Sequence, residues 1–337
     1  MNILLISPTQ SGIGGIAQHV TGLTNYLKSK NHIVEIISSK NSFTIPVKGL
    51  KNPSFMLSSS LKAKFKKNSD IVHAHNIPSA KAMKNASGKK ILSIHGIYSQ
   101  QIENLHNKTI SKIATNFEKD ALSWADAITV VSKDAYEHYK KLGFNVYHIP
   151  NAIDINSLPQ KSIRKYKKQI IFAGRLSPEK GMDVLLELSE ILPLDIHLLI
   201  LGSGPKDFMK NFSRSNIHYL GYVPKDETIS LIRGSDILIQ PSLFEGISSS
   251  ILEAMACRVP VITTNVGGNK EIIEHNKTGI LLETNSSEKL LEEILYLFAN
   301  PTQKNNLIKN AFDVVKNFDW STVGQLYENL YEDLVKL

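Results

Sequence analysis

Short apolar runs rich in isoleucine, leucine and valine alternate with helical patterns along the whole chain. Strands that alternate with helices form right-handed βαβ units around parallel sheets. The alternation restarts midway, and each series is of ordinary domain length, roughly 150 residues. The sequence therefore predicts an α/β protein of two doubly wound domains. The expected strands begin at Ile3, Ile33, Ile71, Ile91 and Ile128, and then at Ile170, Ile196, His218, Ile237, Val261 and Ile280.

The boundary between the two series falls in a polar, basic stretch, residues 154–168, which contains Pro159 and is typical of a linker. A last helical pattern from about Trp320 follows a complete second series. We therefore expect one domain over 1–155, a second over 156–318 and a separate helix over 319–337. The other expected helices span 16–28, 181–192, 225–234, 249–257 and 286–299.

The bulk properties favour a cytoplasmic protein. Cys257 is the single cysteine, which excludes a disulfide framework and fits a reducing compartment. The first residues enter a strand-like run without a basic segment before it, which argues against a signal peptide. No apolar run approaches the roughly 18 residues that a membrane span needs.

Charge is unevenly divided. Residues 1–168 contain 24 Lys and Arg against 9 Asp and Glu, whereas residues 169–337 contain 15 against 22. These balances of +15 and −7 add up to the net charge of +8. A basic first half attracts anionic partners such as lipid headgroups, nucleic acid or a phosphorylated acceptor. A lysine-rich solvated surface is the equally simple alternative.

The segment from Phe244 to Ala256 follows an expected strand and opens a helix. Serines at the helix start supply N-cap oxygens, and the helix N-terminus is a site for a diphosphate. Glu245 in the loop and Glu253 in the helix can point into one pocket and accept hydrogen bonds from sugar and ribose hydroxyls. Alternatively, Ser250 and Glu253 form a capping box that only closes the helix start.

A second loop, Gly174 to Gly181, lies between an expected strand and a helix. Gly174 permits a sharp turn, and Arg175 and Lys180 place two cations near each other. An Arg fork and a Lys point charge together suit a pyrophosphate leaving group. Simple solvation of both side chains is the alternative.

These two loops resemble those of the family 4 glycosyltransferases, which adopt the two-domain GT-B fold. Glu245, Glu253 and the following Ala-Met-Ala match the paired-glutamate signature, and Gly174 to Gly181 matches G-R-L-x-x-x-K-G. The chain departs from the family pattern at Arg258 and Ser248, where glycine is usual. Three further segments are similar to family turns: Ile200 to Pro205, Gly221 to Pro224 and Val266 to Glu271.

The first half matches more loosely. Gly12, Ile13, Gly14 and Gly15 lie between the first strand and a helix, but Ala17 and Gln18 break the spacing of a dinucleotide fingerprint. The second strand ends without an acid for ribose, which disfavours a dehydrogenase. The resemblance implies instead a loop that approaches the donor phosphates.

Three histidines follow or end strands in the first half. His95 is similar to the family histidine that contacts the donor sugar, and His73, His75 and Asn76 resemble a segment on the acceptor side. We expect His73 and His75 to point to opposite faces of their strand, which argues against a shared metal. No Cys or His spacing supports zinc.

The resemblance implies two Rossmann-like domains facing a central cleft, with the C-terminal helix crossing back to the first domain. It implies a retaining, metal-independent hexosyltransferase without a cofactor, which uses a UDP-, GDP- or ADP-sugar by front-face substitution, without a covalent intermediate. Arg175 and Lys180 would hold the leaving diphosphate, Glu245 the sugar and Glu253 the ribose, and His95 would support the reacting carbon. The implied donor-binding residues are Gly14, Gly15, Gly174, Arg175, Lys180, Gly202, Gly204, Val223, Glu245, Gly246, Ile247, Ser248, Ser249, Ser250 and Glu253.

The acceptor is expected to be a glycan or a lipid-linked glycan in cell-surface polysaccharide or glycolipid assembly. Residues 54–67 combine Phe55, Met56, Leu61 and Phe65 with four lysines, a pattern that suits an anionic membrane surface. We therefore expect a peripheral enzyme on the cytoplasmic membrane face. An ordinary surface helix with its apolar side on the core is the alternative.

Two other functions compete with sugar transfer. A sugar-nucleotide epimerase shares the fold, but the pairing of Glu245 and Glu253 with Arg175 and Lys180 argues against it. A non-enzymatic nucleotide or anion binder is the other. Nucleic acid is not expected as a partner, because no basic patch interleaved with aromatic residues occurs.

Overall fold

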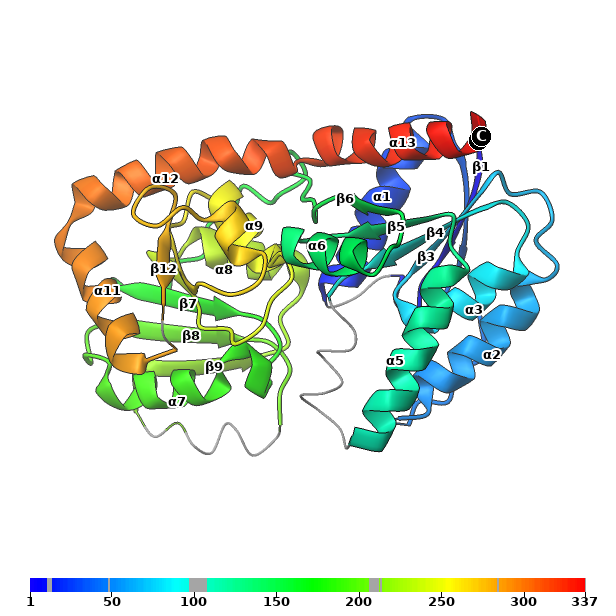
Figure 1. Ribbon diagram of the computed structural model, residues 1–337. Helices are drawn as coiled ribbons and strands as arrows, with labels where there is room; N and C mark the ends of the chain where they lie inside the picture. The colour runs from blue at the N-terminus through cyan, green and yellow to red at the C-terminus, as the bar shows by residue number, and fades with distance from the viewer. Residues whose placement is uncertain are drawn as a thin grey trace. The chain divides into compact units, whose positions relative to one another are not determined.

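The computed structural model describes residues 1–10, 14–47, 49–96, 108–205, 212, 214–283 and 285–336. The chain forms two compact units (Figure 1). Unit 1 contains Met1–Asn151 together with Trp320–Leu337, and unit 2 contains Ala152–Asp319. None of the helices in the described part of the chain has the length and apolar character that crossing a bilayer requires.

Unit 1 is built on a six-stranded parallel sheet in the order β2-β1-β3-β4-β5-β6. Its central strands are largely buried, and all five residues of β3 are inaccessible to solvent, whereas the edge strands β2 and β6 are partly exposed. Burial on both faces explains why the central strands have nearly continuous apolar sequences. The strands are β1 (Asn2–Ile6), β2 (Ile33–Ile37), β3 (Ile71–His75), β4 (Lys89–Ile94), β5 (Ala127–Val130) and β6 (Val146–His148).

All five strands expected in this half are present, and β6 is an addition that its short, half-exposed sequence concealed. The helices of unit 1 follow the strands along the chain, except that the last one comes from the C-terminus (Figure 1). They are α1 (Gly15–Ser29), α2 (Lys51–Ala63), α3 (Ile77–Asn85), α5 (Lys108–Ser123), α6 (Lys133–Lys141) and α13 (Trp320–Lys336).

Helix α13 packs on α1 at two glycines. A Cβ on Gly22 would lie 2.0 Å from the indole nitrogen of Trp320, and one on Gly324 would lie 2.5 Å from the ring of Tyr26. Only glycine permits contact this close, so each aromatic ring sits directly on the backbone of the opposite helix. Trp320 and Tyr327 of α13 are buried against α1, and Tyr331 is buried against His73 of β3. The C-terminal helix is thus an integral part of unit 1.

Unit 2 is a second six-stranded parallel sheet, in the order β12-β11-β10-β7-β8-β9. All six strands predicted for this half are present, although the strand expected to begin at His218 ends at Gly221 and leaves Val223 in the following loop. The strands are β7 (Gln169–Ala173), β8 (His197–Leu201), β9 (Ile217–Gly221), β10 (Ile237–Gln240), β11 (Val261–Thr264) and β12 (Ile280–Leu282).

The helical segments of unit 2 include one close to each of the four predicted helices, and the other four, which are η1, α10, α12 and η3, were not predicted. They are η1 (Pro178–Lys180), α7 (Met182–Ile191), α8 (Lys225–Arg233), α9 (Ser249–Ala256), α10 (Asn269–Ile272), α11 (Ser287–Ala299), α12 (Pro301–Val315) and η3 (Lys316–Phe318).

Helix α9 ends at Ala256, and Arg258 lies two residues beyond it, at the position where the resemblance leads us to expect glycine. Arg258 adopts a left-handed backbone with φ 60°, and the amides of Arg258 and Val259 donate to the carbonyls of Met255 and Ala254 at 3.1 and 2.9 Å. This is the Schellman pattern that normally requires glycine. The Arg258 guanidinium lies 3.9 Å from the ring centroid of Phe312, so a stacking contact accompanies the strained backbone.

Candidate functional site

The strand order of unit 2 reverses between β7 and β10, which are neighbours in the sheet although β8 and β9 lie between them in sequence. Open α/β sheets bind ligands at the carboxyl ends of the strands at such a switch point. The loop after β7 carries Arg175 and Lys180, and the loop after β10 carries Glu245. The topology therefore brings the two predicted loops to the same place.

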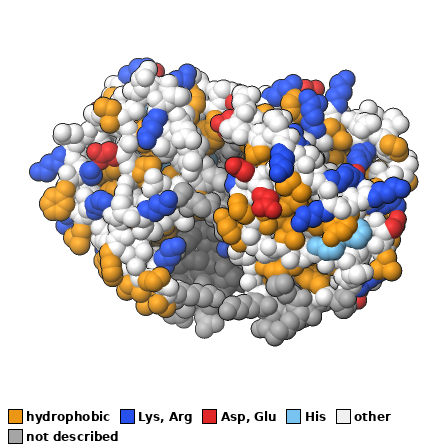
Figure 2. Space-filling view, turned by 180° about the vertical axis from the view of Figure 1, so that it is seen from behind, with side chains coloured by type: hydrophobic (Ala, Val, Ile, Leu, Met, Phe, Trp, Pro, Cys, Tyr) orange, Lys and Arg blue, Asp and Glu red, His pale blue; other side chains and the backbone are white. Residues whose placement is uncertain are grey.

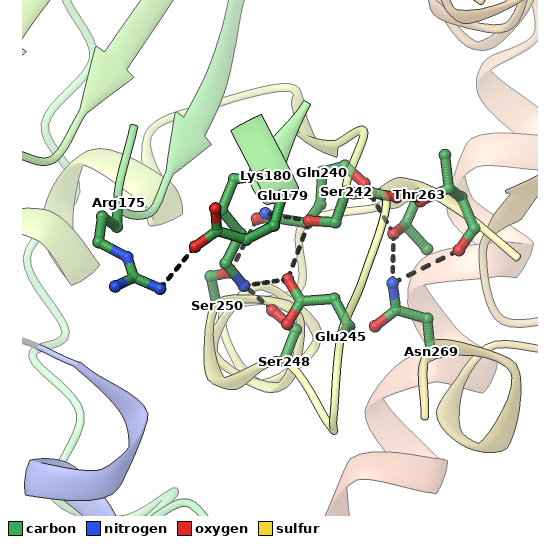
Figure 3. A network of polar contacts seen from close by, with 11 residues as sticks. Arg175, Glu179, Lys180, Gln240, Ser242, Glu245, Ser248, Ser250, Thr263 and Asn269 are labelled. Carbon is green, nitrogen blue, oxygen red and sulfur yellow. Dashed lines mark hydrogen bonds and ion pairs between the residues drawn. The ribbon is translucent and has the colours of Figure 1, made fainter. Parts of the chain in front are cut away.

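Lys180 and Glu245 form an ion pair there. Lys180 Nζ lies 2.5 Å from Glu245 Oε1, with the Glu245 side chain 6% exposed and the Lys180 side chain 20% exposed (Figure 3). Ser242 Oγ donates to the same carboxylate oxygen at 2.9 Å. Two donors thus fix a buried carboxylate, and the orientation of Glu245 is set before any ligand arrives.

The backbone locks these two loops together. The amides of Leu243 and Phe244 donate to the carbonyl of Glu179 at 2.9 and 3.3 Å. On the other side of Glu245, Gly267 lies so close that a Cβ there would be 1.8 Å from the Glu245 carbonyl oxygen. Gly267 also has a φ of 50°, so only glycine suits this position. The turn from Val266 to Glu271 therefore supports the glutamate loop from behind.

Arg175 lies at the outer edge of this network. Its guanidinium contacts Glu179 Oε1 at 2.7 Å, and its side chain is 69% exposed (Figure 3). Partial burial of Glu179 acts to raise the pKa of its carboxyl, but hydrogen bonds from its own backbone and Ser177, and the charges of Arg175 and Lys180, lower the pKa overall. Both predicted cations therefore have carboxylate partners in the ligand-free protein.

The start of α9 carries a serine network. Ser248 is the N-cap residue, and its hydroxyl contacts that of Ser250 at 3.0 Å rather than accepting from a helix amide. Ser250 Oγ in turn donates to Gln240 Oε1 at 3.0 Å (Figure 3). Side chains of the described residues therefore leave the first amides of α9 uncapped, and such amides can bind an anion. Ser249, Gly246 and Ile247 belong to the same loop and first turn.

Glu253 does not act as a capping residue. Its buried carboxylate forms an ion pair with Lys225 Nζ, which comes from the first residue of α8. Glu253 and Glu245 thus each have a lysine partner. Sequence reasoning missed Lys225, although it follows directly after the segment Gly221 to Pro224. The position of this lysine, one residue after a turn that resembles the family pattern, could have indicated that it belongs to the site.

The glycine-rich turns lie at the carboxyl ends of β7 and β8. The amide of Gly174 donates to the carbonyl of Leu201 at 3.0 Å, and the amide of Gly202 donates to the carbonyl of Gly221 at 2.7 Å. Gly204 packs on Leu176, and Val223 packs on the core under α8. These predicted residues therefore lie at the carboxyl ends of β7, β8 and β9, on the β7 side of the switch point.

In unit 1, Gly14 is the N-cap residue of α1 and Gly15 is its first residue. Gly12 and Ile13, the first half of the predicted loop, lie outside the described residues. The switch point of this sheet lies between β1 and β3, whose carboxyl ends are followed by this loop and by Asn76. Asn76 takes a positive φ of 61°, and its Oδ1 accepts from the His95 amide at 3.1 Å.

The histidines of unit 1 form a cluster, and one prediction about them was wrong. The rings of His73 and His75 stack at 4.3 Å between centroids, so both lie on the same face of β3. Residues two apart in a strand share a face, because side chains alternate with period two. His75 Nδ1 lies 3.2 Å from His95 Nε2. His19 of α1, which sequence reasoning did not single out, completes the cluster with its ring 4.9 Å from that of His95.

Helix α13 holds part of this cluster. Tyr331 Oη contacts His73 Nδ1 at 2.6 Å, and Tyr327 Oη contacts His19 Nε2 at 3.1 Å. Burial lowers the pKa of His73 to about 3 and that of His95 to about 4. Burial likewise holds the pKa of His19 and His75 well below the ordinary value. The four rings are therefore neutral at physiological pH.

Three of these histidines could hold a metal. One ring nitrogen from each of His19, His75 and His95 lies within 4.8 Å of the others. His19 Nδ1 and His75 Nε2 are buried without a hydrogen-bond partner among the described residues. Three neutral imidazoles form a zinc-type donor set. The metal prediction thus rested in part on a wrong strand geometry.

Two family descriptions match the chain in succession. "Glycosyltransferase Family 4" matches residues 13–157, and "Glycosyl transferases group 1" matches residues 154–314. The chain is 30% identical to an uncharacterized glycosyltransferase of Methanocaldococcus jannaschii, and the match covers 99% of both proteins. The chain belongs to the family 4 glycosyltransferases.

One further relative and one solved structure extend these comparisons. A phosphatidyl-myo-inositol mannosyltransferase of Mycobacterium leprae is 23% identical over 98% of this chain and 96% of that protein. The HepE protein of Anabaena, solved in complex with UDP and glucose, superposes with a TM-score of 0.76 at 18% identity over 99% of this chain and 100% of that one. The two parallel six-stranded sheets are those of the two-domain α/β GT-B fold. This family 4 chain is therefore a glycosyltransferase.

Proposed function

We propose that this glycosyltransferase takes a sugar from a nucleoside diphosphate sugar and transfers it, with retention of configuration, to a hydroxyl of a glycan or lipid-linked acceptor. The observation that carries the proposal is the buried Lys180–Glu245 ion pair at the switch point of unit 2. A preoriented carboxylate beside a cation suits a sugar hydroxyl next to a departing diphosphate.

The donor roles follow from the contacts. Lys180 and Arg175 follow the same strand and would bind the diphosphate. On donor binding, each cation would replace part of its contact with a glutamate by contacts with phosphate oxygens. The uncapped amides at the start of α9 would bind a further phosphate oxygen. Glu245 would accept from the sugar, and Glu253 from the ribose. The UDP in the HepE complex supports a nucleotide donor of this kind.

His95 would support the reacting carbon through its ring. Its backbone amide already donates to Asn76 Oδ1, and its half-buried ring, whose Nε2 lies 3.2 Å from His75 Nδ1, is the group that we propose to face substrate. The low pKa keeps the ring neutral near pH 7, so it would act as a hydrogen-bonding group and not as a charge. His73, His75 and Asn76 would then shape the acceptor side of unit 1.

Retention by front-face substitution requires no protein nucleophile. The bond from the anomeric carbon to the diphosphate oxygen breaks, and the bond from the anomeric carbon to the acceptor oxygen forms on the same face of the sugar. The leaving diphosphate oxygen accepts the proton of the acceptor hydroxyl. The contribution of the protein is then positioning and charge stabilisation. We propose that no metal takes part, because Lys180 and Arg175 can neutralise the diphosphate. Full activity after treatment with a chelator is the expected result, and activity restored only by added zinc would contradict it.

The acceptor is proposed to be a glycan or lipid-linked glycan of the cell surface. The basic character of residues 1–168 supports an acceptor that carries phosphate. The phosphatidyl-myo-inositol mannosyltransferase relative, whose name gives it a lipid acceptor, supports the same class.

Two measurements test the proposal. Thermal-shift screening with UDP-, GDP- and ADP-sugars should identify one stabilising donor, and Lys180→Ala should abolish the shift. With that donor, free nucleoside diphosphate should appear only when acceptor is added, and the anomeric proton of the new product should keep the coupling constant of the donor. Nucleotide release with conversion of the sugar to an epimer would favour the epimerase alternative, and binding without release would favour a non-enzymatic binder.

A further inference from the structure

The outward face of helix α2 is apolar, which reverses the usual arrangement of a surface helix. Leu57 and Leu61, one turn apart, are 61% and 62% exposed, and Phe65 just beyond the helix is 82% exposed. The inward face, which packs against α3, is formed by Phe55, Ser59, Ser60 and Ala63. A helix that turns its leucines to solvent and its serines to the protein presents a binding face.

The segment before α2 extends this face. Ser58 Oγ donates to the carbonyl of Phe43 at 2.7 Å, and the amide of Ile45 donates to Ser54 Oγ at 2.9 Å. These bonds hold the segment alongside the helix and add further exposed apolar side chains. We call the whole set the α2 apolar surface; it consists of Phe43, Val47, Leu50, Leu57, Leu61 and Phe65, each at least 49% exposed.

Positive charge surrounds the α2 apolar surface. Residues 36–69 contain seven lysines and neither aspartate nor glutamate. Lys40, Lys51, Lys64 and Lys67 are exposed, whereas Lys62 donates to the carbonyl of Asn41 at 2.7 Å and Lys66 pairs with Glu35. Figure 2 shows the side opposite to that of Figure 1, on which basic and hydrophobic side chains are interspersed over the visible surface.

We propose that the α2 apolar surface inserts into a lipid bilayer that contains anionic headgroups. Exposed leucine and phenylalanine side chains bury in the acyl boundary while the surrounding lysines meet the negative headgroups. A nucleic acid would meet the lysines but leave the six apolar groups without a partner. The six side chains belong to unit 1 and the proposed donor site belongs to unit 2, so this docking goes beyond sugar transfer and does not depend on it.

Co-sedimentation of the full chain with vesicles tests the proposal. The wild type should bind vesicles of phosphatidylglycerol and phosphatidylcholine at low salt, bind less at 0.5 M salt, and bind pure phosphatidylcholine weakly. The triple variant Leu57→Ser/Leu61→Ser/Phe65→Ser should lose at least about tenfold in partitioning. Lys64→Gln/Lys67→Gln should weaken binding to anionic vesicles only.

Matched controls keep the test specific. Leu142→Ser and Leu194→Ser remove exposed leucines, 59% and 62% exposed, elsewhere in units 1 and 2, and should bind vesicles like the wild type. Circular dichroism and nucleotide thermal shifts check that every variant is folded. Phe65→Trp should give a blue-shifted emission with anionic vesicles, which reports insertion and not charge attraction alone.

Three outcomes would overturn the proposal. One is a monodisperse wild type that does not bind anionic vesicles. Another is a triple variant that binds as well as the wild type. The third is a wild-type dimer that the triple variant converts to monomer without any vesicle binding, which would assign the α2 apolar surface to self-association. A failure of nucleotide binding would contradict only the function proposed for unit 2.

Discussion

Lys225 at the start of α8 forms an ion pair with the buried carboxylate of Glu253 on α9. The Glu253 side chain is 6% exposed, and that of Lys225 is 41% exposed, so the lysine closes the carboxylate off from solvent. The group proposed to accept from the ribose is thus already engaged in the free protein. Lys225 is therefore a positioning residue, which fixes where the Glu253 carboxylate points.

Replacing Lys225 by alanine should weaken donor binding more than it slows the transfer step. The Glu253 carboxylate would remain buried without its cation, which costs about 1 to 3 kcal/mol of folding stability. We expect the donor KM to rise about tenfold while kcat changes less than threefold. Steady-state kinetics with varied donor and urea unfolding measure the two effects.

The control for this prediction is another lysine–glutamate pair. Lys277 and Glu274 pair at 2.9 Å with both side chains more than 60% exposed, so Lys277→Ala should change neither stability nor KM appreciably. Lys225→Arg should recover most of the donor affinity. A Lys225→Ala variant with wild-type KM would show that the pair has no part in donor binding.

The Lys180–Glu245 pair should behave as one coupled unit. Lys180→Ala leaves a 6% exposed carboxylate with Ser242 as its remaining donor, so it should cost about 3 kcal/mol of stability. In a Glu245→Gln background the same substitution should cost much less. Urea unfolding of the wild type, Lys180→Ala, Glu245→Gln and the double variant gives the coupling energy of the pair. If the losses of unfolding free energy in the two single variants simply add up in the double variant, the prediction is contradicted.

Replacing Arg175 should lower activity without lowering stability appreciably. Its contact with Glu179 is largely exposed, so Arg175→Ala should change the free energy of unfolding by no more than about 0.5 kcal/mol. If Arg175 binds the leaving diphosphate, kcat should fall by about 10²-fold or more. Unfolding and kinetic measurements on the same variant test both halves, and an active Arg175→Ala enzyme would exclude Arg175 from the diphosphate site.

Much of this molecule could be predicted from local pattern. Most of the expected strands are short apolar runs that are largely buried in the sheet. The loops that carry Arg175, Lys180 and Glu245 come together because strand ends meet at a switch point. Lys225 could not be predicted, since its pairing depends on how α8 and α9 pack. His19 was missed for a similar reason: it lies on an ordinary helix, and only the sheet and α13 bring it to His95 and Tyr327.

Arg258 tests how the turn after α9 tolerates the absence of glycine. Its left-handed backbone costs roughly 1 kcal/mol for a residue with a Cβ, and its contact with Phe312 returns a similar amount. Arg258→Ala keeps the strain and loses the contact, whereas Arg258→Gly loses both. We therefore expect Arg258→Ala to be less stable than Arg258→Gly by about 1 kcal/mol in urea unfolding, and the reverse order would contradict this account.

The buried histidines of unit 1 should make the protein sensitive to mild acid. Burial lowers the folded-state pKa of His95 to about 4 and of His73 to about 3, whereas an unfolded histidine titrates near 6.5. The unfolded chain therefore binds more protons than the folded one below about pH 6.5. Their contribution to stability is fully present above that pH and is lost as pH falls, by up to about 1.4 kcal/mol per pH unit for each histidine.

Urea unfolding midpoints between pH 7.5 and 5.5 measure this loss before most carboxylates titrate. His95→Asn removes one of the four clustered rings from the proton balance, so the stability of this variant should fall less steeply over this range than that of the wild type. Equal slopes in His95→Asn and the wild type would mean that His95 stays accessible to protons in the folded protein, and its neutral role beside the donor sugar would then fail.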